Sequence, residues 1–506
     1  IYAAWFAAKY SPDANFNLAL FFLTTFFLIF YLTSLAYKLV SKEDISVENI
    51  VLILANSFIF YGFGYSILEN RAGYENHLGL FTAGNAAIHF VFAFAVSRLK
   101  VVSANLVYLL SALVLTFITI AVPVQFDGNY ITLIWTAEAA ILFWIGRAKQ
   151  ISLYENYSFP LMISASVSLL KDWAHLYENY SSFETALSPI FNPYFATAIF
   201  FIAAFGLINY INRNANYDST VSTEIIKIAD YVLPSVFLFV LYNAFRLEIG
   251  NYYHYRYVAT AVGAALDTRV YDTDLQLFNF VWQINYTMLF LCVLTFVNVK
   301  KFKSYALGFV NLGLNALILL VFLTVGLYIL GELRESYLAQ SADSFPSTFF
   351  HILIRYISYA FAAALIYSIY QYFRRDFIKE NLSDRDSTYA FDFILHVSLL
   401  WISSSELVNL MDIFGYNDSY KLGLSIFWGI YALALIILGI SRNKKHLRVG
   451  AITLFAVTLT KLFLYDISEL GTISKTVVFV SLGVLLLIIS FLYTKYRHLI
   501  FDADEI

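Results

Sequence analysis

Five ionisable side chains interrupt long apolar stretches of this chain, and they are the residues best placed to do chemistry. They are Glu138, Lys171, Arg355, Glu406 and Lys461. A charged side chain at the centre of a bilayer costs about 2.5–3.5 kcal/mol on insertion scales, so such a charge is expected to be paired or used. Counted along their apolar stretches, all five fall in one layer near the same membrane face. We therefore predict a polar vestibule that opens outward, is lined by these five residues and binds a substrate.

A structural explanation of the same residues stays open. Lys171 and Lys461 lie near the ends of their stretches, where long basic side chains reach the membrane interface at modest cost. Glu138 lies deeper, on one helical face with Trp135 and the small residue Gly146, and small residues let neighbouring helices approach closely. That face is therefore expected to point into the protein. We predict a basic partner for Glu138, with Arg355 as first choice and Lys171 as second.

Patterns typical of catalysis are missing from the sequence. It contains no HExxH pair, no GxSxG elbow and no phosphate-binding Gly-Lys-Ser/Thr loop. The single cysteine, Cys292, excludes an internal disulfide framework. His89 and His396 fall within apolar stretches, where they could relay protons or simply bond a neighbouring helix. We predict no catalytic residues, no metal site and no cofactor, and we favour a protein that is not an enzyme.

Composition places most of the chain in lipid. Of 506 residues, 60% are hydrophobic and 13% are charged, about half the usual charged fraction of roughly 25%. A bilayer is crossed by a helix of about 20 apolar residues. The sequence therefore predicts an all-α, polytopic transmembrane bundle with about 15 spans, preceded by the end of a partial helix. The expected spans are 15–40, 46–68, 78–97, 101–123, 130–146, 155–173, 193–211, 223–245, 275–299, 304–331, 348–373, 389–411, 421–440, 446–465 and 473–495.

The distribution of basic residues predicts the orientation. Lysine and arginine concentrate in alternate loops, which lie in the cytoplasm by the positive-inside rule. The loops between them are acidic or neutral, such as PVQFDGNY and MDIFGYNDSY. We predict a bacterial cytoplasmic (inner) membrane protein with a cytoplasmic C-terminus. The basic loops are those near Lys38, Arg98, Arg147, Arg213, Lys300, Arg374, Arg442 and Lys495.

Internal similarity predicts tandem antiparallel hairpin repeats. The stretch 77–100 aligns with 421–444 without a gap, and in the same frame Trp135 and Gly146 correspond to Trp428 and Gly439. The helices that follow carry Lys171 with Asp172 and Lys461 with Asp466. Transporters often contain such repeats, although duplicating a hairpin is also a simple way to enlarge a membrane protein. We expect hairpin-repeat regions over 1–245 and 277–506, joined by an external loop or cap over 246–276.

Two blocks of sequence, 122–147 and 448–493, contain a recognisable set of residues. The set is Pro123, Gln125, Asp127, Gly128, Trp135, Glu138, Ala139, Gly146, Arg147, Arg448, Gly450, Lys461, Asp466, Leu470, Lys475, Phe479, Gly483 and Tyr493. With these residues the blocks resemble a large bacterial family of multi-pass predicted membrane proteins of unknown function (domain of unknown function 2339). The resemblance implies a polytopic helical fold and a longer native protein, and it implies no activity.

Three functions stay open at this point. Buried charges, repeats and short loops favour a transporter or flippase-like permease for a polar or amphipathic solute. Acidic residues in the loop 246–276 are the feature that favours a membrane-embedded transferase acting on lipid-linked envelope precursors. A non-catalytic membrane scaffold is the third. Expected partners are membrane lipids and other envelope proteins, with no nucleic acid, and the sequence predicts no particular oligomer.

Overall fold

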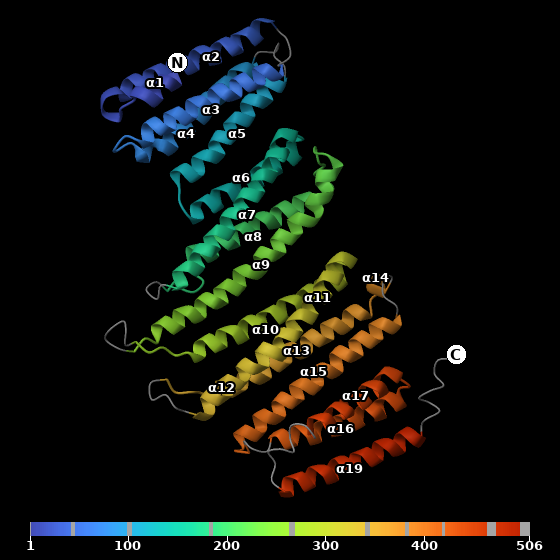
Figure 1. The fold of residues 1–506 in the computed structure, drawn as a ribbon. Helices are drawn as coiled ribbons and strands as arrows, with labels where there is room; N and C mark the ends of the chain where they lie inside the picture. Colours follow the sequence, from blue (N-terminus) through green and yellow to red (C-terminus); the bar gives the residue numbers. More distant parts are fainter. Residues whose placement is uncertain are drawn as a thin grey trace. The chain divides into compact units, whose positions relative to one another are not determined.

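The computed structural model is helical and divides into two compact units, Ile1–Phe245 and Arg246–Ile506 (Figure 1). It describes residues 2–41, 46–98, 104–181, 186–262, 269–339, 345–379, 384–416, 420–462 and 472–495. Within these ranges the extended structure is an isolated bridge between Val262 and Val270. The predicted all-α class is therefore confirmed.

Twelve segments of the described chain are long and apolar enough to cross a membrane. They account for twelve of the fifteen spans expected from the sequence. The other three expected spans, 155–173, 446–465 and 473–495, fall on helices that are not among the twelve. The first of them carries Glu155, Lys171 and Asp172 among serines and tyrosines, which lower its hydropathy.

Consecutive helices of the first unit pack as hairpins, α2 with α3, α4 with α5 and α6 with α7, and α6 also contacts α8 (Figure 1). Short connections between long apolar helices produce this arrangement. The helices are α1 (Tyr2–Lys9), α2 (Pro12–Ser41), α3 (Val47–Glu69), η1 (Glu75–His77), α4 (Leu78–Arg98), α5 (Ala104–Gln125), α6 (Asn129–Lys149), α7 (Ser152–Ser181), α8 (Pro193–Arg213) and most of α9 (Thr223–Ala259).

Aromatic side chains fill the core of this unit's first five helices. Phe27 of α2 stacks on Phe60 of α3 with ring centroids 4.3 Å apart. Phe117 of α5 is fully buried and lies parallel to the His89 ring of α4, at 5.3 Å. Stacked and edge-to-face rings add specific geometry to the burial of large apolar surfaces. This core explains part of the high aromatic content of the chain.

The second unit packs around α10 and α13. Helix α10 contacts α11, α12 and α13, while α15 bridges from α13 to α16 (Figure 1). Its helices are α10 (Asp274–Val297), η3 (Asn298–Phe302), α11 (Tyr305–Val321), η4 (Phe322–Gly326), α12 (Leu327–Ala339), α13 (Phe350–Phe373), α14 (Asp376–Lys379), α15 (Asp384–Ile413), α16 (Tyr420–Ser441), α17 (Lys445–Lys461) and α19 (Thr472–Lys495). Segments η3 and η4 are π-helical turns, which occur frequently at functional sites.

The expected loop over 246–276 begins later than predicted. Helix α9 continues through residue 245 and ends at Ala259. Beyond residue 245, Arg246 Nη1 donates to Gln283 Oε1 of α10 at 3.0 Å, and Asn251 is 1% exposed. Apolar length placed the end of the helix at residue 245, whereas α9 continues to Ala259 through a polar, tyrosine-rich stretch.

Gly146 lies at a close contact between α6 and α7. A Cβ built at Gly146 would lie 2.6 Å from the backbone nitrogen of Glu155. We expect Gly146→Ala to lower the melting temperature of the purified protein in detergent, because α6 and α7 would have to separate.

Gly84→Ala is the matched control for this substitution. Gly84 also lies inside a helix, α4, but a Cβ there would meet nothing within 4 Å. Alanine favours helix over glycine by about 0.5–1 kcal/mol, so melting should be unchanged or higher. Equal melting of the two variants would contradict the steric role of Gly146.

Candidate functional site

Two of the five predicted site residues, Arg355 of α13 and Glu406 of α15, lie next to each other in the second unit. Arg355 is 1% exposed, and its Nη1 lies 4.0 Å from Glu406 Oε2. The two charges are not in direct hydrogen-bond contact. Instead Arg355 Nη1 donates to the hydroxyl of Tyr359 and to Ser405 Oγ, each at 3.0 Å.

Glu406 is held by neutral donors. The hydroxyls of Tyr356 and Tyr359 donate to its two carboxylate oxygens at 2.8 and 3.1 Å. Asn409 Nδ2 donates at 3.2 Å. Tyr359 thus accepts from Arg355 and donates to Glu406, so one hydroxyl bridges the two charged groups. We call Arg355, Tyr356, Tyr359, Ser405, Glu406 and Asn409 the Arg355 cluster.

The Arg355 cluster is buried on one side and open on the other. Phe322, the first residue of the π-helical segment η4, packs edge to face against the Tyr359 ring. Glu406 is 21% exposed and Tyr356 is 44% exposed. A fully buried cation therefore lies next to a carboxylate that reaches the surface of the chain. Such an arrangement can bind and release a charged group.

A second cluster lies at the same end of α13. His351 Nε2 contacts Asp274 Oδ2 of α10 at 3.2 Å, and Ser336 Oγ of α12 donates to the same oxygen. Burial and the neighbouring Asp274 carboxylate raise the pKa of Asp272, which precedes α10. On α12, Arg334 pairs with Asp412 of α15 at 2.9 Å. The α10, α12, α13 and α15 ends are thus tied together by ionic contacts.

A third cluster lies at the opposite end of α15. Asp392 Oδ2 accepts from Lys444 Nζ at 2.5 Å and contacts His446 Nε2 at 2.7 Å. One turn further along α15, His396 Nδ1 contacts the Tyr431 hydroxyl at 3.0 Å. These contacts attach α15 to α16 and to the start of α17. In the described part of the chain, no group of three or more His, Cys, Asp or Glu side chains could hold a metal ion.

The structure gives Glu138 a neutral partner. Thr119 Oγ1 of α5 donates to Glu138 Oε1 at 3.1 Å, and the carbonyl of Thr119 accepts from the Trp135 indole. Lys171 is exposed on α7 and is not the partner of Glu138, so that second choice was wrong. Its neighbour Asp172 faces α6 instead, accepting from Thr132 Oγ1 at 2.6 Å. A pair between Glu138 and Arg355 would join the two units and stays a prediction.

Lys461 bonds to α16 rather than to the Arg355 cluster residues named above. Its Nζ donates to Ser425 Oγ at 3.0 Å and to the carbonyl of Lys421 at 3.3 Å. The motif residue Trp428 donates from its indole to Ser404 Oγ of α15 at 2.9 Å. Gly439 lies where a Cβ would be 2.7 Å from Arg448 Cγ. Asp466 lies outside the described residues.

The sequence did not reveal an ionic clamp at the junction of α6 and α7. Arg147 and Glu155 are both buried, with Nε 2.5 Å from Oε1. Ser219 and Thr220, from the segment between α8 and α9, donate to the Glu155 carboxylate. Arg147 also donates to the carbonyl of Tyr217 and to Asn212 Oδ1. Arg147 was interpreted as a topology marker, because no local pattern links it to a loop 70 positions away.

Neutral polar side chains occupy the interior of several spans. Asn311 Nδ2 contacts Thr295 Oγ1 at 2.9 Å and the Tyr372 hydroxyl at 3.0 Å, linking α10, α11 and α13. In the first unit, His89 Nδ1 contacts the Tyr31 hydroxyl at 2.6 Å. This contact to a neighbouring helix supports the structural explanation of His89.

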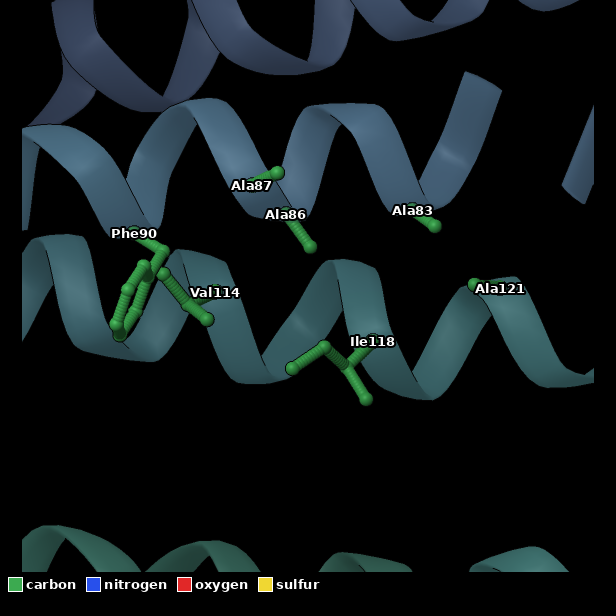
Figure 2. A pocket seen from close by; sticks show the side chains of 7 residues that line it. All are labelled: Ala83, Ala86, Ala87, Phe90, Val114, Ile118 and Ala121. Atoms are coloured by element: carbon green, nitrogen blue, oxygen red, sulfur yellow. The ribbon is translucent and has the colours of Figure 1, made fainter. Parts of the chain in front are cut away.

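The first unit has two apolar grooves on its helices. One has a volume of about 300 Å³ and runs between α4 and α5 (Figure 2). It is lined by Ala83, Ala86, Ala87, Phe90, Val114, Ile118 and Ala121. A second, of about 330 Å³, is lined by side chains of α2, α3 and α4. Neither groove contains any of the five predicted site residues.

Comparison with known proteins identifies a family. The family described as "Predicted membrane protein (DUF2339)" matches residues 1–496. No curated protein and no solved structure matches the chain. The match covers both units, including the Arg355 cluster and the clamp.

The clamp generates a test of its structural role. We expect Arg147→Ala to lower stability by about 3–5 kcal/mol, the usual cost of removing one partner of a buried ion pair. Thermal melting in detergent measures this loss. Hydrogen exchange should also become faster over 214–222, the segment that Arg147 and Glu155 hold.

Lys149→Ala is the control, because Lys149 belongs to the same helix end but is exposed. Its melting temperature and exchange rates should match those of the wild type. If Arg147→Ala behaves like this control, the clamp does not stabilise the fold.

Proposed function

Since the chain belongs to this family of predicted membrane proteins, we propose that it is a transporter or flippase-like permease for a polar or amphipathic solute. The observation that carries the proposal is the Arg355 cluster, a buried arginine bridged by Tyr359 to a partly exposed glutamate. Ionisable groups at membrane depth are costly and commonly mark solute or ion pathways. The predicted outward vestibule, in this proposal, centres on Arg355 and Glu406.

The proposed topology has fifteen spans in a bacterial cytoplasmic membrane, with a cytoplasmic C-terminus. In addition to the twelve segments, α7, α17 and α19 would cross the bilayer. The support for α7 and α17 is that each packs closely along a neighbouring span, α6 and α16 respectively. The orientation rests on the alternation of basic loops.

We also propose that the α6–α7 and α16–α17 hairpins are copies of one repeat. Support comes from contacts that recur at a constant offset of 293 positions. Gly146 approaches Glu155 as Gly439 approaches Arg448. Thr132 bonds to Ser168 as Ser425 bonds to Lys461. Lys461 therefore corresponds in position to Ser168, which is one turn before Asp172.

The apolar grooves support membrane lipids as partners of the first unit. The groove of Figure 2 is lined by alanine, valine, isoleucine and phenylalanine side chains of two candidate spans. An acyl chain satisfies such a surface without any polar contact. Other envelope proteins remain proposed partners on the basis of the sequence alone.

The transferase alternative has one specific observation in its favour. Ser336, Asp274 and His351 meet where α10, α12 and α13 end. A hydroxyl beside a carboxylate and an imidazole is a combination used in group transfer. However, the serine donates to the aspartate rather than to the histidine, so no activated nucleophile is formed. We therefore rank the transporter first.

Purified protein in liposomes tests the transporter proposal. Vesicles that contain the full chain should exchange fluorescent phospholipids between leaflets, or accumulate at least one solute from a labelled metabolite mixture. Glu406→Gln should reduce that flux, because it removes the carboxylate that Tyr356, Tyr359 and Asn409 hold.

Lys149→Ala vesicles serve as the control, because Lys149 is exposed and lies outside the Arg355 cluster. An absence of both lipid exchange and solute uptake in wild-type vesicles would favour a scaffold. Turnover of a lipid-linked precursor that Ser336→Ala abolishes would favour the transferase.

Cysteine labelling in spheroplasts tests the orientation. The only native thiol, Cys292, is buried, so its background is expected to be low. In a Cys292→Ser chain, we expect Tyr416→Cys to react with an impermeant maleimide, because it lies in a predicted external loop and is 63% exposed. Asn443→Cys, exposed in a predicted cytoplasmic loop, should react only after lysis. The reverse pattern would invert the proposed topology.

A further inference from the structure

The guanidinium of Arg355 has an unused hydrogen-bonding edge. Its Nη1 has two partners, but its Nη2 is buried and bonds to no acceptor in the described part of the chain. An arginine side chain offers five N–H donors and stays charged at any physiological pH. Leaving a charged donor buried without a partner costs more than leaving a neutral one. An acceptor that bonds to Arg355 Nη2 would therefore remove this cost.

Glu406 does not serve as that acceptor. Its nearest oxygen is 4.0 Å from Nη1, and that oxygen accepts from Tyr359. Its other oxygen accepts from Tyr356 and Asn409. Three neutral donors thus hold the carboxylate one hydroxyl away from the guanidinium. Arg355 and Glu406 are therefore separated by the Tyr359 hydroxyl and do not form a direct hydrogen-bonded salt bridge.

We infer that Arg355 binds an anionic group of the solute, a carboxylate or a phosphate, through this free edge. The inference rests on the proposed transporter function and names the chemistry of its substrate. The planar guanidinium matches both groups, and its bonds to them are about twice as strong as bonds between neutral groups. The Arg355 cluster also contains the hydroxyl groups of Ser405 and Tyr356. Ser405 Oγ is 3.0 Å from Nη1, and Tyr356 is half-exposed.

Glu406 then acts as a competitor of the solute. Its negative charge lies 4.0 Å from Arg355 and would also lie near any anion bound there. Like charges this close repel strongly when they are partly shielded from water. A bound anion must therefore share Arg355 with Glu406, which weakens its binding and favours its release. Weakening Glu406 should tighten anion binding, although it reduces transport.

The first experiment measures anion binding to the full chain in neutral detergent. The melting temperature is followed against potassium phosphate or potassium acetate, with potassium chloride holding the ionic strength constant. A ligand that binds only the folded state raises the melting temperature as its concentration exceeds Kd. We expect saturable stabilisation by at least one of the two anions.

Substitutions then locate the binding. Arg355→Lys keeps the charge but loses the planar fork, and should raise the apparent Kd at least tenfold. Arg374→Lys is the matched control, because Arg374 ends the same helix but is exposed. Glu406→Gln should lower the apparent Kd roughly tenfold. If Arg355→Lys does not fold, Glu406→Gln still tests the inference. An apparent Kd of Glu406→Gln that equals or exceeds the wild-type value would overturn it.

A parallel arm separates the two sources of the anionic group. The same titrations use a short-chain phosphatidylglycerol and, as its control, a diacylglycerol of equal chain length. Stabilisation by phosphate or acetate indicates a free solute, whereas stabilisation by phosphatidylglycerol alone indicates a lipid phosphate. If none of these probes stabilises the wild type, or if Arg355→Lys and Arg374→Lys respond alike, the inference is wrong.

Failure of the inference is distinct from failure of the proposed function. Binding in detergent requires no flux, and flux in liposomes requires no binding to Arg355. Anion binding without flux would reject the transporter function and leave the anion site in place. Flux of a neutral solute without anion-dependent stabilisation would reject the anion site at Arg355 and leave the transporter function in place.

Discussion

The cost of burying polar groups in lipid determines many of the contacts between helices in this structure. Charged groups offset that cost by pairing at helix ends, as Arg147 does with Glu155 and Asp392 does with Lys444. Further inside the spans the contacts are neutral, such as those of Asn311 with Thr295 and Tyr372. This division follows from the cost of a charge, which rises with its depth in the bilayer. Helices are thus joined by ions near their ends and by amides and hydroxyls between them.

The sequence was sufficient to predict the class of the fold and most helix positions. Hydropathy reports whether about 20 residues can enter lipid, and this property is local. The same reasoning identified Arg355 and Glu406 as deep charges, and the structure brings them together. The tyrosine bridge between them could not be predicted. In the sequence, nothing distinguishes Tyr356 and Tyr359 from ordinary interfacial tyrosines before α13 and α15 are known to be neighbours.

Two contacts that the sequence did not predict have a common cause. Glu138 accepts a hydrogen bond from the Thr119 hydroxyl of the preceding helix. Arg147 was counted as a loop charge, although it lies 4% exposed beneath the segment between α8 and α9. In both cases the partner is set by packing between helices. Spacing along one helix determines which residues share a face, but it does not determine what that face contacts.

Two arginine–glutamate pairs in this chain differ in how completely their polar atoms are used. In the clamp, Nε and Oε1 are 2.5 Å apart, and Ser219 and Thr220 complete the carboxylate. Every polar side-chain atom of Arg147 and Glu155 has a hydrogen-bond partner. Between Arg355 and Glu406 the separation is 4.0 Å, a hydroxyl lies between them, and one guanidinium nitrogen is free. Leaving a buried charged donor without a partner is costly, and this cost is the physical basis on which we propose an anion site at Arg355 but not at Arg147.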